Sequence, residues 1–545
     1  FVRLAIRDVS LSGSQPMASS CGKYCLTFNG EIYNAEDYKN LLQEKGVNFK
    51  STSDTEILLY ALIHFGLDFV LKEFDGMFAF SFYNSITNEV VVARDRLGIK
   101  PLYVGFNSDD DIIFSSQYDH IINYEKLQDE KLDAAAIASF LQLGFISDGL
   151  GAVKNTQLLP HGHYVKINAT GYTITAYFDV LHKQKSSNAA ISEIDVLSAV
   201  QSQLISDVPL GTFMSGGVDS SLLTLLANKH KPITAYTVST GDSITDEREK
   251  AVWFANKFTI PQVVKSISKQ EIEEVVEQNI KAYTEPFADF SSLPSLLISK
   301  IARKEVKVVL SGDGPDELFW GYARNSKMIK VVEKFYRSKI TNFVDYCLSK
   351  LSITPKTISK RLFTSPTFAD YYYKSLFLFG SELWLSKICK IKPAEAPFSN
   401  IIKEKTDIAA TDIDAAMNTI WNYEMNIHLQ RILLKMDRAS MYQSLESRVP
   451  YLSNSIIEIA AQTSWKQCIV DNNGKNNIKQ LLAKYTDNEF VYSTKKGFDI
   501  PMNQWINLSL KNNIIDAINN MPQELLELFN TKQLNKMLSK HFEGK

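Results

Sequence analysis

The segment SGGVDSS, from Ser215 to Ser221, decides how this chain folds and which ligands it can bind. It lies between the strand-like run GTFM and the helix-like run SLLTLLANKH, so it reads as a glycine turn that opens a helix. Backbone N–H groups at a helix start carry partial positive charge, and such a turn binds anions. Gly216 and Gly217 let a phosphate approach the backbone closely. Asp219 is unexpected beside an anion unless a cation accompanies it, which indicates magnesium.

Two other interpretations of this turn follow from the residues alone. The segment lacks the lysine of the GxxxxGK[ST] pattern, so a Walker-type phosphoryl-transfer loop fits poorly. A generic Gly-Gly-x-Asp sequence is more often a serine N-cap on an ordinary helix after a tight turn. SGGVDSS is longer than such a generic match, and both the anion site and the simple cap stay open at this point.

A second acidic turn follows further along the chain. The segment SGDGPDE, from Ser311 to Glu317, comes directly after the buried strand-like run KVVL. Its acids therefore emerge at the carboxyl end of a parallel strand, where open sheets bind ligands. Three acids in one turn repel one another unless a metal or a cationic group offsets their charge, which favours a cation site. A solvated turn is the alternative, because Asp and Gly populate turns readily.

The pattern around these turns predicts two domains of different fold. Short strand-like runs such as KYCLTF, MFAFSFY and HYVKI, separated by turn residues including Asn29-Gly30, predict an antiparallel β-sheet sandwich over residues 1–182. The polar stretch KQKSSNAA predicts a linker at 183–190. Strands that alternate with helices then predict a parallel-sheet α/β domain with a helical C-terminal part over 191–545. The chain is thus expected to combine α+β and α/β domains.

Composition narrows the class of protein. The 545 residues are 45% hydrophobic, enough for a sizeable core. Lys plus Arg total 59 against 61 for Asp plus Glu, so the sequence has no basic excess for nucleic-acid binding. No apolar stretch is long enough to span a bilayer, and no membrane partner is expected. Five cysteines, without zinc-like spacing, suit a reducing compartment, and the expected location is cytoplasmic.

Several motifs together resemble one enzyme family. SGGVDSS looks like the pyrophosphate-binding loop of ATP-pyrophosphatase-type ligases. Together with SGDGPDELFWGY it resembles the synthetase domain of glutamine-hydrolysing asparagine synthetases. Three later segments are similar to family segments in the same order: LLKMDRASMYQSLESRVPYL at 433–452, GKNNIKQLL at 474–482 and STKKGFDIPMNQW at 493–505.

The resemblance implies a set of nucleotide and metal contacts. The residues that it places around the adenosine are Phe213, Val238, Ser311 and Gly312. Those that it places around the phosphates of ATP are Ser215, Gly216, Gly217, Asp219, Ser220 and Ser221. Asp219 and Asp316 would bind Mg²⁺, and Lys475 would neutralise the α-phosphate during attack. Asp313 stands where many relatives carry a substrate-contacting glutamate. Without the family, Lys475 would read as a surface lysine.

The amino-terminal half resembles the amino-terminal-nucleophile glutaminase domain of the same family. The matching segments are FNGEIYN, SDTE, GMFAF and ARDR through PLY. The resemblance implies that Asn29 and Gly30 supply oxyanion donors, that Arg3 pairs with the α-carboxylate of glutamine, and that Glu31 and Asp54 hold its amino group. From the residues alone, Asn29-Gly30 would instead be a hairpin turn and Glu31 a solvated charge.

Two departures from the family pattern concern the glutaminase half. The family nucleophile is a cysteine at the mature amino terminus, a role that Phe1 cannot perform. Cys21 and Cys25 lie in strand-like runs and are expected to be buried thiols. We therefore expect that the printed sequence lacks its beginning, and that as printed it uses ammonium and not glutamine. Gln117 stands where relatives usually show glutamate near the domain interface.

The implied reaction is ATP-dependent asparagine synthesis. Aspartate would be activated as β-aspartyl-AMP and then attacked by ammonia, with glutamine as the nitrogen source, and a homodimer is a common family state. Three alternatives are an amide ligase for another acid, such as a sugar acid or β-lactam precursor, a nucleic-acid-modifying adenylating enzyme, and a non-catalytic protein of the same fold. The charge balance and the glutaminase-like half disfavour the second. The presence of Asp219, Asp316 and Lys475 disfavours the third.

Overall fold

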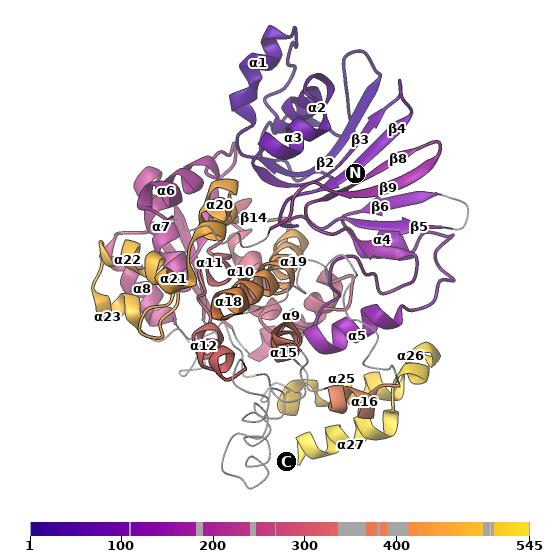
Figure 1. The fold of residues 1–545 in the computed structure, drawn as a ribbon, viewed down its shortest axis with the longest axis vertical. Coiled ribbons are helices and arrows are strands. Elements are labelled where there is room, and N and C mark those ends of the chain that lie inside the picture. The colour runs from indigo at the N-terminus through magenta and orange to yellow at the C-terminus, as the bar shows by residue number, and fades with distance from the viewer. Residues whose placement is uncertain are drawn as a thin grey trace.

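The computed structural model contains antiparallel sheets in the amino-terminal part and a parallel sheet surrounded by helices in the remainder (Figure 1). It describes residues 2–107, 111–180, 189–239, 247–267, 269–335, 367–378, 382–390, 412–493, 502 and 506–543. Among these residues, no helix is both long and apolar enough to cross a membrane. The predicted linker at 183–190 lies mostly outside the described residues, so the predicted domain boundaries stay a prediction.

Two antiparallel sheets form the amino-terminal part. The larger has the order β1 (Met17–Ala18), β2 (Tyr24–Ile32), β3 (Gly76–Asn84), β4 (Glu89–Arg94), β8 (His163–Asn168) and β9 (Gly171–Ala176). The smaller has the order β6 (Ile112–Ser115), β5 (Tyr103–Phe106) and β7 (Thr156–Leu158). The antiparallel fold predicted for this half is therefore confirmed.

Successive side chains of β3 point to opposite faces of the larger sheet, and each face packs against a different layer of the amino-terminal half. Phe78 and Phe80 face a core shared with helices α2 (Asp54–His64) and α3 (Leu67–Glu73). Ala79, which points to the other face of the sheet, packs instead against Val104 of the smaller sheet. The larger sheet is thus covered by helices on one face and by the second sheet on the other, as Figure 1 shows.

A five-stranded parallel sheet organises the second half. Its order is β12 (Gln262–Ser266), β11 (Thr234–Ser239), β10 (Leu210–Phe213), β13 (Val308–Leu310) and β14 (Glu446–Arg448). The chain runs outward from β10 through β11 to β12 and then returns to the other side of β10 with β13. This reversal makes the space beyond β10 and β13 the switch point of the sheet, where α/β proteins bind ligands.

Helices cover both faces of the parallel sheet, as a fully buried strand such as β13 requires. Val308 and Leu310 pack into a core that includes α7 (Val218–His230) and α8 (Arg248–Lys257). Val309, pointing the opposite way, packs into a core that includes α9 (Lys269–Ala282) and α10 (Ser292–Ala302). The predicted α/β fold is confirmed by this arrangement.

The remaining helices complete the two halves. Those that belong to the amino-terminal half are η1 (Leu11–Gly13), η2 (Ala35–Tyr38), α1 (Lys39–Glu44), α4 (Tyr118–Ile122) and α5 (Ala134–Leu143). Those that follow are α6 (Glu193–Ser202), α11 (Pro315–Leu318), α12 (Ala323–Phe335), α15 (Phe368–Ser375), α16 (Glu382–Ile388), α18 (Ile413–Tyr423), η3 (Glu424–His428), α19 (Leu429–Tyr442), η4 (Pro450–Leu452), α20 (Asn454–Gln462), α21 (Trp465–Cys468), α22 (Asn476–Ala483), α23 (Asn488–Tyr492), η5 (Ile506–Leu510), α25 (Lys511–Asn519), α26 (Gln523–Leu528) and α27 (Thr531–Phe542).

Buried polar contacts join the two halves. Lys100 in the first half forms an ion pair of 3.1 Å with Asp437 on α19, and both side chains are buried. Asp75, between α3 and β3, accepts a hydrogen bond of 3.3 Å from the backbone N–H of Asn454 at the start of α20. Because unpaired charges are costly to bury, these contacts fix how the halves meet.

Asp75 gives this contact a pH dependence that can be tested. Burial raises the pKa of Asp75 to about 6, from an ordinary value near 3.8. The folded state therefore holds this proton more tightly than the unfolded state, and the stability that it provides is lost as pH rises through about 6. Asp75→Asn is expected to stabilise the protein by about 1–2 kcal/mol at pH 7.5, after allowance for partial solvent access. Thermal melting should show a gain at pH 7.5 that vanishes below pH 4; an equal gain at both pH values would contradict this account.

Candidate active site

The two predicted acidic turns lie side by side. β10 and β13 are neighbouring parallel strands, with Thr212 opposite Leu310, so the turns that follow them leave the same edge of the sheet. A Cβ atom added to Gly312 would lie 2.9 Å from the backbone nitrogen of Ser220. Only a glycine lets the second turn approach the first so closely.

The first turn has a tightly bonded inner side and an accessible outer side. Gly216 has a φ of +85°, and a Cβ there would lie 2.8 Å from the backbone nitrogen of Ala251 on α8. The Ser215 hydroxyl accepts a hydrogen bond of 3.2 Å from the N–H of Gly217 and lies 3.1 Å from the Ser220 hydroxyl. Among the residues that the structure describes, a Cβ on Gly217 would meet within 4 Å only that Ser215 oxygen, at 3.2 Å. The Gly217 side of the turn thus leaves room for a ligand at the start of α7.

Lys475 joins the two acidic turns. Its Nζ lies 2.5 Å from Asp219 and 2.6 Å from Asp316, and its side chain is only 5% exposed. The residue is the N-cap of α22 and has a left-handed backbone with φ of +55°, held by a 3.0 Å hydrogen bond from its N–H to the carbonyl of Phe319. Such a conformation in a residue other than glycine costs about 1–3 kcal/mol and often marks a functional site. The interpretation of Lys475 as a surface lysine is therefore wrong.

Two glycines that were not predicted allow close packing around Lys475. A Cβ on Gly321 would lie 2.0 Å from Asp316 Oδ1 and 2.6 Å from Lys475 Cε. A Cβ on Gly474 would lie 1.9 Å from the carbonyl oxygen of Trp320. The signal in the sequence was their position, because one directly precedes the lysine of GKNN and the other ends SGDGPDELFWG.

The carboxylates suit magnesium bound together with phosphate. Within the described ranges, no group of three or more His, Cys, Asp or Glu side chains could hold a metal ion by itself. Mg²⁺ is commonly bound by one or two carboxylates plus the phosphates of a substrate, with water completing its shell. Asp219 and Asp316, which already converge on one cation, fit that donor set.

The other residues predicted for the nucleotide surround the same switch point. Ser311 donates its hydroxyl hydrogen to Asp313 over 2.6 Å, so this aspartate bonds within its own turn. Phe213 and Val238, at the ends of β10 and β11, are buried in the core that includes α10. Ser221, in the first turn of α7, is fully buried. Contact of these residues with a nucleotide remains a prediction.

A protonated acid lies next to Asp316. Burial and the neighbouring Asp316 raise the pKa of Glu317 to about 8, so the side chain is mostly neutral at pH 7. Glu317 accepts a hydrogen bond of 2.5 Å from the Tyr322 hydroxyl and lies 3.9 Å from His428. Burial keeps the pKa of His428 well below its usual range. Glu317 itself therefore adds little negative charge beside Asp316 at neutral pH, and the nearby buried carboxylate of Glu424 is paired with Arg324 at 2.6 Å.

In the amino-terminal half, Asn29 and Gly30 lie inside strand β2 and not in a hairpin turn. Asn29 is opposite Ala79 and Gly30 is opposite Phe78 of β3, so the turn predicted from the residues alone is wrong. A Cβ on Gly30 would lie 2.0 Å from the carbonyl oxygen of Met77, which explains the glycine by close approach. The Asn29 amide donates a hydrogen bond of 2.9 Å to Ser116.

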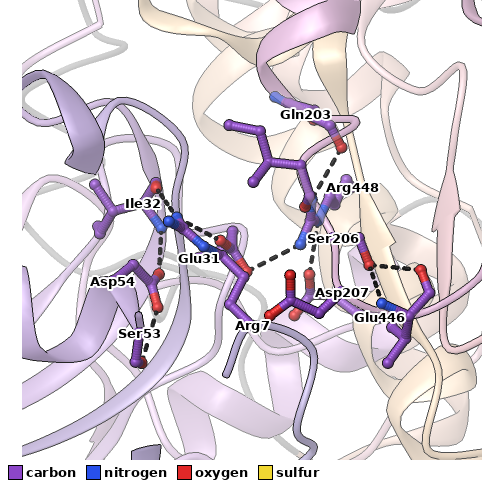
Figure 2. Close-up of polar contacts among 12 residues, drawn as sticks. Arg7, Glu31, Ile32, Ser53, Asp54, Gln203, Ser206, Asp207, Glu446 and Arg448 are labelled. Atoms are coloured by element: carbon purple, nitrogen blue, oxygen red, sulfur yellow. Dashed lines mark hydrogen bonds and ion pairs between the residues drawn. The ribbon is translucent and has the colours of Figure 1, made fainter. Parts of the chain in front are cut away.

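Glu31 and Asp54 lie close together in a buried cluster at the boundary between the halves (Figure 2). Glu31 is 3% exposed, so the solvated charge considered for it is wrong. Its two carboxylate oxygens accept hydrogen bonds from Arg7 at 3.2 Å and from Arg448 at 2.9 Å. Asp54 accepts a hydrogen bond of 2.9 Å from the N–H of Ile32. Burial, with the nearby Asp54 carboxylate, raises the pKa of Glu31 well above its usual range.

Arg3 lies at the edge of this region and has a different set of contacts. Its guanidinium donates to the main-chain carbonyls of Arg7 and Ser10, each at 2.9 Å, and to that of Asp8 at 2.5 Å. The Asp8 carboxylate accepts the N–H of Thr52, which lies two residues before Asp54. The structure thus links Arg3 to the Asp54 segment through Asp8 and to the Glu31 cluster through the main-chain carbonyl of Arg7.

Contacts at the boundary explain the neutral residue at 117. Gln117 accepts a hydrogen bond of 2.9 Å from Arg438 on α19. Arg438 already has a charged partner, because it donates to Glu285 at 3.0 Å, and a second carboxylate at 117 is not needed to balance it. The predicted position of Gln117 near the domain interface is confirmed.

The burial expected for Cys21 and Cys25 can be compared with their positions in the structure. Cys21 is exposed and precedes β2, so its expected burial is wrong, and Cys25 in β2 is half-buried. The segment 493–505, quoted for its family resemblance, falls mostly outside the described residues, as does Phe1.

Comparison with known proteins gives consistent matches across the whole chain. Residues 195–545 match the asparagine synthase family, and residues 1–178 match the glutamine amidotransferase domain. The chain is 28% identical over 542 residues to asparagine synthetase [glutamine-hydrolyzing] 1 of Bacillus subtilis, covering 96% of this chain and 82% of the relative. It is 26% identical to a putative asparagine synthetase of Mycobacterium tuberculosis, covering 93% of this chain and 80% of the relative. A putative asparagine synthetase of Methanocaldococcus jannaschii is 31% identical over 348 residues, which cover 59% of this chain and 66% of that protein. The family model alone matches well over half of the sequence, and the chain therefore belongs to the asparagine synthase family.

Proposed function

We propose that this protein synthesises asparagine from aspartate with ATP, taking the nitrogen from glutamine. The observation that supports this most directly is the position of Lys475, whose ammonium lies between Asp219 and Asp316 at the switch point of a parallel sheet. A glycine turn suited to phosphate adjoins this cluster, and the chain belongs to the asparagine synthase family. The named relatives are asparagine synthetases that hydrolyse glutamine.

In the proposed first step, the β-carboxylate of aspartate attacks the α-phosphorus of ATP. A new P–O bond forms, the bond to the β-phosphate breaks, and the products are β-aspartyl-AMP and pyrophosphate. The N–H groups and hydroxyls at 215–221 hold the phosphates, and Lys475 neutralises charge that develops on the α-phosphate. Magnesium, held by Asp219 and Asp316, would supply charge neutralisation at the phosphates. Asp313 would contact the aspartate substrate.

In the second step, ammonia attacks the acyl carbon and AMP leaves, which yields the amide. Because ammonia is mostly protonated in neutral water, its release and use require an enclosed route between the two sites. Asn29 and Gly30 would stabilise the oxyanion formed on glutamine. Arg3 would bind its α-carboxylate, and Glu31 and Asp54 its amino group.

We also propose a domain organisation and an oligomeric state for the chain. We assign the glutaminase to residues 1–182 and the synthetase to 191–545, with a linker between them. We further propose a cytoplasmic homodimer that binds no nucleic acid, as the family resemblance and the charge balance suggest. Analytical ultracentrifugation of the purified protein, with and without added transfer RNA, tests the homodimer and the absence of nucleic-acid binding.

The reaction itself is tested by following all products. With ATP, Mg²⁺, aspartate and ammonium, we expect AMP, pyrophosphate and asparagine in equal amounts, because the adenylate is consumed stoichiometrically. In protein that carries the amino-terminal cysteine of the family, replacing ammonium by ¹⁵N-amide glutamine should place the label in asparagine, whereas the chain as printed should transfer none. Formation of ADP and phosphate instead would contradict adenylation. Faster pyrophosphate release with a sugar acid or a β-amino acid than with aspartate would contradict the substrate assignment.

A further inference from the structure

Arg448 contacts the amino-terminal half with its side chain and its own half with both side chain and backbone (Figure 2). Its Nη2 donates to Glu31 at 2.9 Å, and its Nε donates to Glu446 at 2.8 Å. Its Nη1 donates to the main-chain carbonyls of Gln203 at 2.9 Å and Ile205 at 2.6 Å. The side chain is completely buried. With four acceptors around one planar group, the guanidinium has a fixed position.

The backbone of the same residue supports the nucleotide turn. Arg448 ends strand β14, where it lies opposite Leu310 of β13. Its carbonyl oxygen accepts a hydrogen bond of 2.8 Å from the N–H of Ser311, the first residue of the second acidic turn. One residue therefore binds Glu31 through its guanidinium and Ser311 through its carbonyl oxygen.

The buried charges around Arg448 favour one more cation. Three buried carboxylates, those of Glu31, Asp54 and Glu446, lie close to the two buried guanidinium groups of Arg7 and Arg448. When all five are ionised, this group carries one net negative charge, which is costly away from water. The α-ammonium of glutamine would balance it, and the charge felt by Arg448 would change when that ammonium binds.

We infer that Arg448 is a positioning residue that couples glutamine binding to nucleotide binding. A change in the charge or position of the Glu31 carboxylate is transmitted to the N–H of Ser311, because Arg448 contacts the first through its side chain and the second through its backbone. Coupling of this kind is reciprocal, since each ligand must alter the affinity of the other by the same factor. The inference rests on the proposed function, which places Glu31 in the glutamine site and Ser311 in the nucleotide site.

The test is a pair of binding titrations on the full chain. L-Glutamate keeps the α-ammonium and α-carboxylate of glutamine and does not turn over, so it serves as the probe. Calorimetry gives the Kd of ATP with Mg²⁺ in the presence and absence of glutamate, and the reverse. In the unaltered protein, we expect glutamate to change the Kd of ATP about five-fold or more. ATP should change the Kd of glutamate by the same factor. In Arg448→Lys, which keeps the charge and loses the planar fork, this factor should fall to within two-fold of one.

A matched control separates coupling from general damage to the interface. Asp437→Asn removes the charge from the buried Lys100–Asp437 pair, which also joins the halves and contacts neither Glu31 nor Ser311 among the described hydrogen bonds. It should keep the full coupling factor. If Arg448→Lys does not fold, Glu446→Gln loosens the same guanidinium and should lower the factor at least two-fold.

The outcomes distinguish this inference from the proposed function. A coupling factor near one in the unaltered protein, or an unchanged factor in the folded Arg448→Lys and Glu446→Gln variants, overturns the role of Arg448. Absence of any binding of ATP or glutamate, or of AMP formation from aspartate, counts against the proposed function instead. The KM for ATP in the ammonium-driven reaction gives a second readout: it should respond to glutamate in the unaltered protein and not in Arg448→Lys.

Discussion

Replacing Lys475 by alanine is expected to lower aspartate-dependent pyrophosphate release about 10²–10³-fold, the loss typical of removing one preorganised electrostatic contact from a transition state. The ammonium of Lys475 is buried and lies within 2.6 Å of both Asp219 and Asp316, so it has one defined position beside the phosphate turn. Its strained backbone, with φ of +55°, shows that the surrounding structure holds it there at a cost. The measurement is the rate of pyrophosphate release with ammonium as nitrogen source.

The same variant should also change stability in a ligand-dependent way. Without the ammonium, two close carboxylates repel each other, and the melting temperature should fall. Added Mg²⁺ should recover more of this loss in Lys475→Ala than in the unaltered protein. Lys484→Ala is the matched control, because Lys484 follows the same helix α22, is 56% exposed and pairs only loosely with Glu193 at 3.4 Å. An activity of Lys475→Ala close to that of the control would refute the proposed role.

Replacing Gly30 by alanine is expected to reduce the affinity for glutamate at least ten-fold while leaving the ammonium-driven rate within about two-fold. The added Cβ would lie 2.0 Å from the Met77 carbonyl oxygen and 2.8 Å from Phe78 Cα. Both are backbone atoms of β3, so β2 and β3 must separate and carry Asn29 and Glu31 with them. Such overpacking typically costs about 1–3 kcal/mol, and the melting temperature should drop as well. Binding is measured by calorimetry and the rate by asparagine formation.

Gly22→Ala is the control that separates the effect of the steric clash in Gly30→Ala from the effect of backbone strain. Gly22 precedes β2 and also has a positive φ, of +70°, but an added Cβ would meet no atom of the described part of the chain within 4 Å. It should therefore show the modest cost of a left-handed alanine and normal glutamate affinity. Equal losses of affinity in both variants would show that strain, and not the contact between β2 and β3, explains the effect of Gly30→Ala.

The pairing of the two acidic turns was predictable because local patterns and sheet geometry agree. The runs GTFM and VVL became β10 and β13, and the carboxyl ends of neighbouring parallel strands share one edge. The antiparallel sheets of the first half were predictable from alternation, as in β3. The reversal of strand order beside β10 was not predicted, since nothing local in a sequence states which strands become neighbours.

Other features depend on contacts between distant segments. Asn29-Gly30 is a strong turn signal, yet close packing of β2 on Met77 overrides it. β14 has only three residues, two of them charged, and its place in the sheet comes from pairing with β13. The ion pair between Glu31 and Arg448 joins residues 417 positions apart. Single-sequence patterns do not contain such pairings, and family resemblance named Glu31 without its partner.

The late position of β14 and Lys475 in the chain affects how the protein can be made. The acidic turns leave the ribosome well before residues 446–448 and Lys475, so β13 is at first an unpaired strand edge. Unpaired edges in nascent chains are prone to aggregation, and long-range parallel pairing forms slowly. Until Lys475 emerges, Asp219 and Asp316 have no ammonium between them and oppose closure of the site. Nascent chains that stop short of α22 are therefore expected to aggregate more readily, because the ammonium of Lys475 can join the two turns only after residue 475 has been translated.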